Sequence, residues 1–232
     1  MTNNNIWELK KLLECASHED RTNLERLIKA PFGNSPEKLC DHFQFLLHGF
    51  FGQIVNGDDY RKFVTRVADH LQIDWPATLR GRQWHELPPA EIEDAIVVTS
   101  FQRTFSKLSD EEKRRLAEQL GQQSNDPNFV GQLLSGGALL AAKLSGFQIY
   151  LMATTAVKAV SVAIGITLPF GIYTTLTKGI SIIIGPIGWA FLGLSVLLRF
   201  NQADWERLIP GIIYVSYIRH KLESERPKYI IT

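Results

Sequence analysis

Hydrophobic positions in the first part of the chain recur at helical spacing. Ile6, Leu9, Leu12 and Leu13 fall on one helical stripe, and apolar residues between 60 and 71 repeat the pattern. Spacing of three and four residues places such side chains on one face of a helix. The first part of the chain therefore predicts a series of short amphipathic helices, and no stretch of it predicts a convincing β-strand.

Polar residues mark where several of these helices begin. Ser17 followed by Asp20 predicts an N-cap, and Ser109 followed by Glu112 predicts a capping box. The polar stretch 121–128 predicts a linker. We therefore expect two parts: an amphipathic helical domain over 1–128, and an apolar helical hairpin with a C-terminal helix over 129–232.

The second part begins with a long stretch that has no acidic residue. From Phe129 to Leu198 there is no Asp or Glu, and the formal charges are Lys143, Lys158 and Lys178. Soluble domains need charged surface, so this stretch is expected either inside a helical bundle or in a lipid bilayer. Its last segment, Gly179–Leu198, has the length of about 20 residues that crosses a bilayer.

A helical hairpin follows from the short connection between the last two apolar segments. Residues 174–178 separate the segment 147–173 from the segment 179–198, which forces the two helices to run antiparallel. Lys178 then lies at the turn, and Arg199 closes the hairpin. A final helix is expected from Trp205 to about Glu223.

Lys158 has two interpretations of equal weight. A lysine inside an apolar helix tends to be paired or to line a cavity. It can instead extend to the membrane surface and mark one end of a helix. No acidic residue of the apolar stretch could pair with it.

Prolines and glycines shape the predicted hairpin. Pro169 lies near the end of its first arm, and Gly185, Pro186, Gly188 and Trp189 form the GPIGW sequence of its second arm. A proline inside a span breaks the hydrogen-bond ladder and bends the helix. Neighbouring helices must then satisfy the freed carbonyl groups.

The remaining composition argues against several classes of function. A formal net charge of +1 gives no basic surface for nucleic acid. The sequence has no HExxH, GxSxG or phosphate-loop motif, and no His/Cys group with ligand spacing. We therefore expect no catalytic residues, no metal and no cofactor. Two cysteines indicate a reducing compartment, and the first residues lack the pattern of a signal peptide.

Two stretches of the second part, GITLPFGIYTTLTKGISIIIGPIGWAFLGLSVL and IPGIIYVSYIRHKL, resemble the YaaW-like family of uncharacterised bacterial proteins. ELKKLLECASHEDRTNLERLI and DDYRKFVTRVADHLQI are similar to its N-terminal and central elements. The family is grouped with ubiquinol–cytochrome c chaperones, which assist assembly of a respiratory membrane complex. It supplies no established catalytic residues. The stretch HGFFGQIVNGDDY departs from the family's glycine motifs.

Together these features predict an all-α, non-enzymatic protein on the cytoplasmic side of a bacterial inner membrane. Its hairpin, Phe147–Leu198, would insert in the bilayer or dock on it. One alternative is a soluble bundle that buries a pore-forming type of hairpin until triggered. Another is an assembly chaperone, whose partner would be a membrane-protein client. The oligomeric state, the client and the trigger stay open.

Overall fold

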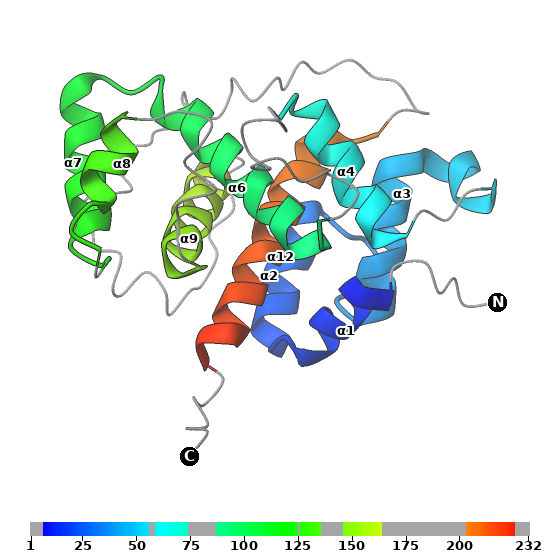
Figure 1. Cartoon of the computed structure of the whole chain (residues 1–232). Coiled ribbons are helices and arrows are strands. Elements are labelled where there is room, and N and C mark those ends of the chain that lie inside the picture. The colour runs from blue at the N-terminus through cyan, green and yellow to red at the C-terminus, as the bar shows by residue number, and fades with distance from the viewer. Residues whose placement is uncertain are drawn as a thin grey trace.

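A computed structural model describes residues 7–55, 59–73, 87–124, 126–135, 146–163 and 203–225, with the backbone alone for residues 50–55 and 158–163. Every regular element within these ranges is a helix, so the prediction of an all-α fold is confirmed (Figure 1). The helices are α1 (Trp7–Cys15), α2 (His18–Ile28), α3 (Pro36–Val55), α4 (Tyr60–His70), α6 (Pro89–Phe105), α7 (Asp110–Gly121), α8 (Phe129–Ser135), α9 (Gly146–Ala163) and α12 (Trp205–Glu225).

The predicted helix starts are confirmed by their hydrogen bonds. The Ser17 hydroxyl accepts a hydrogen bond from the Asp20 amide, which satisfies one free N–H of α2. Ser109 and Glu112 form the reciprocal capping box at the start of α7. Local sequence therefore fixes where these two helices begin.

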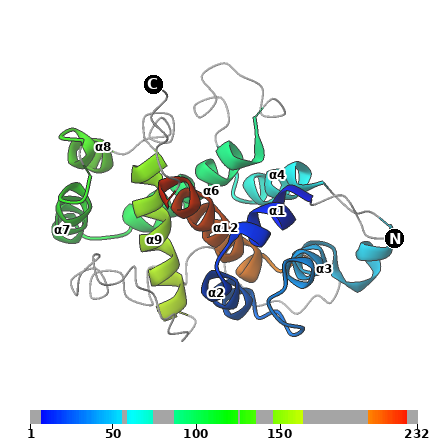
Figure 2. The same ribbon diagram turned by 90° about the horizontal axis from the view of Figure 1, so that it is seen from below.

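The helix α12 lies at the centre of the bundle. Every residue from Leu208 to Ile218 is buried, so no face of this stretch meets solvent. It packs against α1, α2, α3, α4, α6 and α9, which surround it in Figure 2. A helix that is hydrophobic all round must be buried, and here the surrounding helices bury it.

Two helices, α4 and α9, run antiparallel to α12, and the start of α6 meets its end. At the start of α4 Tyr60 lies near the end of α12, while His70 at its other end stacks on Trp205, the first residue of α12. Asp94 near the start of α6 meets His220. A Cβ placed on Gly146, the first residue of α9, would lie 3.4 Å from Nδ1 of His220. The last residues of α4 and α9 therefore point toward the end of the bundle at which α12 begins.

The hydrophobic core runs across the boundary predicted at Asn128. That residue lies between α7 and α8, and its amide donates to Asp126. Yet α9 and α12, from the second predicted part, pack directly on α6 and α2 of the first. The described helices of both parts share one continuous core.

Gly211 marks the closest approach between α12 and its neighbours. A Cβ at this position would lie 2.7 Å from a ring carbon of Phe43 and 2.8 Å from a methyl of Ile28. We expect Gly211→Ala to lower the free energy of unfolding by about 1–3 kcal/mol, because overpacking forces buried groups apart. Urea unfolding followed by circular dichroism would measure this.

Gly131 in α8 is the matched control, because a Cβ there meets nothing within 4 Å. Gly131→Ala should be neutral or stabilising by up to about 1 kcal/mol, as alanine favours the helix. Equal destabilisation by both substitutions would contradict the close packing of α12.

Candidate functional site

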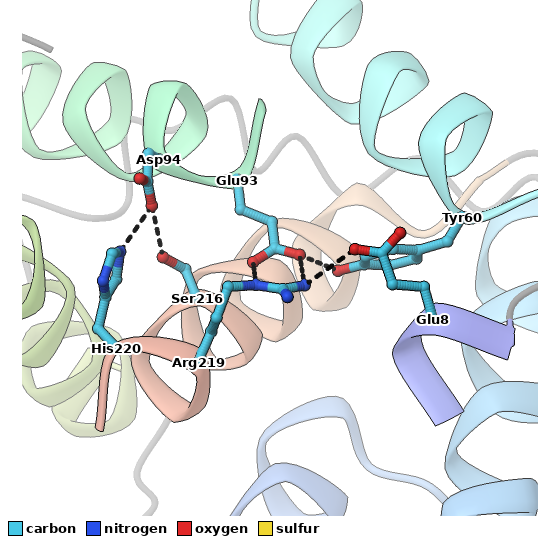
Figure 3. A network of polar contacts seen from close by, with 7 residues as sticks. All are labelled: Glu8, Tyr60, Glu93, Asp94, Ser216, Arg219 and His220. Carbon is cyan, nitrogen blue, oxygen red and sulfur yellow. Dashed lines mark hydrogen bonds and ion pairs between the residues drawn. The ribbon is translucent and has the colours of Figure 1, made fainter. Parts of the chain in front are cut away.

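A buried carboxylate ties the end of α12 to the start of α6. The Glu93 side chain is completely buried, and Arg219 donates to both of its oxygens, with Nε–Oε2 at 2.9 Å and Nη2–Oε1 at 2.8 Å. The Tyr60 hydroxyl donates to Oε1 over 2.7 Å. Figure 3 shows these groups converging from α4, α6 and α12, with Glu8 of α1 lying 3.7 Å from the guanidinium.

Burial and pairing act in opposite directions on Glu93. Complete burial raises the pKa of this carboxyl group, and the hydrogen bonds from Arg219 and Tyr60 oppose the rise. Although burial also works against its charge, the hydrogen bonds to Glu93 raise the pKa of Arg219. Two guanidinium nitrogens within 2.9 Å favour the ionised pair at neutral pH.

A second carboxylate lies one residue further along α6. Asp94 accepts hydrogen bonds from Ser216 at 3.2 Å and from Nε2 of His220 at 2.8 Å. Burial disfavours the imidazolium, but the hydrogen bond and the negative charge of Asp94 outweigh it and raise the pKa of His220. In a third contact of α12, the ammonium group of Lys221 donates a hydrogen bond to Asp20 of α2 over 2.8 Å.

This network holds α12 in place and offers little to a substrate. The carboxyl group of Glu93 is taken up by Arg219 and Tyr60, and it has no exposed surface. Over the described ranges, no group of three or more His, Cys, Asp or Glu residues could hold a metal ion. Charge-assisted hydrogen bonds of this kind are geometrically specific. The arrangement therefore acts as a latch that fixes the register of α12 against α6.

The opposite end of α12 is where the apolar stretch rejoins the bundle. The Asp204 amide donates to the carbonyl of Leu46 in α3 over 2.7 Å. Tyr150 of α9 stacks on Tyr217 of α12 at a centroid distance of 5.5 Å, and Gly146 lies beside His220. The two helices therefore run antiparallel. Ala163, the last residue of α9, and Ala203, which precedes α12, both lie toward the same end of this helix pair.

Most of the predicted site residues fall outside the description. Lys158 belongs to α9, but only its backbone is described. Seven residues lie outside the described ranges: Pro169, Lys178, Gly185, Pro186, Gly188, Trp189 and Arg199. Among the helices described here, none combines the length and the apolar character that crossing a membrane requires.

The first residues of the predicted hairpin belong to the protein core. From Ile149 to Val157, α9 is buried except at Tyr150, and it packs against α6 and α12. Phe147, in the first turn of α9, is 47% exposed. Residues 149–157 therefore contribute to the protein core.

The latch was not expected from the sequence. Acidic residues near a helix start, as Glu93 and Asp94 are, already have a local explanation in the helix dipole. The structure keeps Glu91 in that role and turns the other two toward α12. The sequence feature that could have indicated the latch is the basic end of the last helix, Arg219 to Lys221. Once this helix is known to be buried, its cationic side chains need acidic partners elsewhere in the chain.

Similar proteins include three from Helicobacter pylori, each described as a UPF0174 protein. Two from strain J99 are 24% identical over 191 residues (81% of this chain, 72% of that protein) and 25% identical over 174 residues (72% and 78%). One from strain 26695 is 20% identical over 201 residues (84% and 92%). No family model matches the chain, and no solved structure does. The similarity to UPF0174 proteins extends over most of the chain.

The latch predicts a strong effect of removing its cation. Arg219→Met should lower the free energy of unfolding by about 3–5 kcal/mol, because a buried carboxylate is left unpaired. The double variant Glu93→Gln/Arg219→Met should recover part of this loss. Urea unfolding of the wild type and both variants would measure it, and a double variant no more stable than Arg219→Met would contradict the role of the pair.

The His220 contact predicts a pH dependence of stability. Because the pKa of His220 is raised in the folded chain, its contribution is fully present below the ordinary value of 6.5 and is lost as the pH rises through the folded-state value. His220→Gln should therefore cost about 1.5–3 kcal/mol at acidic pH, the range for a hydrogen bond to a charged group.

The difference between wild type and His220→Gln should shrink as the pH rises above 6.5. Unfolding curves recorded across this range would measure it. His18→Gln, at an exposed position that starts α2, is the control. A difference that stays constant with pH would show that His220 contributes through packing alone.

Proposed function

We propose that the protein is a non-enzymatic, membrane-associated helical protein. Its bundle holds an apolar helical hairpin, from Lys158 to Arg199, in the cytoplasmic membrane of a bacterium. The bundle remains on the cytoplasmic side. No cofactor takes part in this function.

One observation carries the proposal: the stretch between Ala163 and Ala203 starts and finishes at the same end of the α9–α12 pair. Tyr150 stacks on Tyr217 and Gly146 lies beside His220, which makes the two helices antiparallel. A segment tethered in this way can enter a bilayer only if it also returns. The number of crossings is then even, which a helical hairpin satisfies.

The lengths suit two crossings. A helix needs about 20 residues to span the hydrocarbon core of a bilayer. Residues 158–177 and 179–198 provide two arms of this length, separated by Lys178. Lys158 and Arg199 then lie at the two ends nearest the bundle, where their long side chains can reach the membrane surface.

The YaaW-like resemblance supports the same location. The chaperones with which that family is grouped act on a membrane complex, so an assembly role would place the client beside the hairpin. The client would be a membrane protein, and it would contact the hairpin within the bilayer.

Replacing residues 164–202 with a Gly/Ser linker removes the second arm and most of the first, and so tests the proposal. A linker of about 12 residues has a root-mean-square span of about 19 Å, enough to join ends at the same side of the bundle. The shortened chain should keep its helical fold and move from the carbonate-washed membrane pellet to the soluble fraction. The full chain, processed in parallel, should stay in the pellet.

Two results would contradict the proposal. If the shortened chain unfolds or aggregates, the apolar stretch is part of the core, as in the soluble pore-forming type of bundle. If the full chain leaves the pellet with carbonate, the hairpin is not integrated. Circular dichroism of the shortened chain separates the first result from a failure of expression.

A further inference from the structure

We propose that the end of the bundle at which α12 begins rests on the phospholipid headgroups. This inference depends on the proposed function, because it assumes a hairpin in the bilayer directly below. The docking end comprises Phe45, Arg66, His70, Arg103, Trp205 and Arg207. These residues come from α3, α4, α6 and α12.

Trp205 and His70 form the centre of the docking end. Their rings stack at a centroid distance of 4.1 Å and an angle of 6°. Partial burial and the charge of Arg103 lower the pKa of His70, so the stacked pair is uncharged at neutral pH. A tryptophan held in this way presents an apolar ring with a polar edge, which suits the membrane–water interface.

Phe45 extends the apolar surface of this end. It is 41% exposed and stacks on His42 with ring centroids 5.9 Å apart. The next residue, Leu46, accepts the hydrogen bond from Asp204. Phe45 therefore lies beside the point where the chain returns from the apolar stretch.

Three arginines belong to the docking end. Arg103 donates to the carbonyl of Leu71 at the end of α4, and Arg66 lies 3.3 Å from His48. Arg207 pairs with Asp204 at 3.3 Å. Arginine can bind phosphate with a planar fork of donors while its stem covers apolar surface. Such side chains suit the phosphate groups of lipids.

A lipid surface is favoured over a protein partner by where the chain goes. Both ends of the apolar stretch leave from this end, so an inserted hairpin would bring the membrane to it. Acidic groups are also present here, among them Asp204 and the exposed Glu206. The docking end is thus not strongly basic, and we expect contact with zwitterionic lipid as well as anionic lipid.

Native tryptophans test the inference in the full chain. Trp205 reports on the docking end and Trp189 on the hairpin. Trp7 is the control: it is 54% exposed and next to Glu8, which lies near Arg219. Arg219 is about 21 Å along α12 from Trp205, at a rise of 1.5 Å per residue. Each reporter would be the single tryptophan, with the others changed to phenylalanine.

The three variants would be reconstituted in phosphatidylcholine vesicles that carry a nitroxide either on the headgroup or deep in the acyl chain. Trp205 should lose more emission to the headgroup nitroxide than Trp7 does, and Trp189 should lose emission to the acyl-chain nitroxide. Equal quenching of Trp205 and Trp7 would overturn the docking proposal. Unquenched Trp189 would overturn the hairpin itself, so the two failures are distinguishable.

Hydroxyl-radical footprinting of the wild-type chain provides a measurement without substitutions. Reconstitution should protect Phe45 and Trp205 from oxidation and leave Trp7 as reactive as in detergent. Protection of all three, or of Trp7 alone, would overturn the docking proposal.

Discussion

The burial of α12 on every side is the constraint on which the rest of the structure depends. This helix follows the apolar stretch in the chain, yet its residues from Leu208 to Ile218 form the centre of the bundle. Without it, the stripes of α2, α3, α4, α6 and α9 would face one another across a void. Because buried voids are costly, the chain must return from the apolar stretch to complete its own core. The helices on either side of the apolar stretch, α9 and α12, are consequently both fixed in the bundle.

The latch adds position to this burial. An apolar helix surrounded by apolar neighbours could slide by a turn at modest cost, because Ile and Val contacts are alike along it. The pairing of Glu93 with Arg219 permits one register, since a shift would leave a buried charge unpaired. Such a pair need not add to net stability, because desolvation offsets much of the attraction. Its contribution is the specific placement of α12, and with it the position at which the chain re-enters.

Sequence reasoning was successful where the forces are local. Periodicity and caps predicted the helices and the starts at Ser17 and Ser109, because these depend on residues three or four positions apart. It did not find the latch, because Glu93 and Arg219 are 126 residues apart. An acidic residue near a helix start, such as Glu93, also has an adequate local explanation in the helix dipole. Nor could sequence reasoning identify residues 149–157 of α9 as protein core. Core packing and a bilayer both favour apolar side chains, so composition alone does not distinguish a core helix from a membrane helix.

The placement of cations gives the proposed hairpin its orientation. Lys178 at the turn would face the far side of the membrane, which runs against the tendency for cations to stay in the cytoplasm. Lys158 and Arg199 at the near ends outnumber it, and the arginines of the docking end lie on the same side. The charge bias of the whole region therefore favours a cytoplasmic bundle. Reversing the hairpin would require moving a bundle with a buried ion pair and a completed core across the membrane.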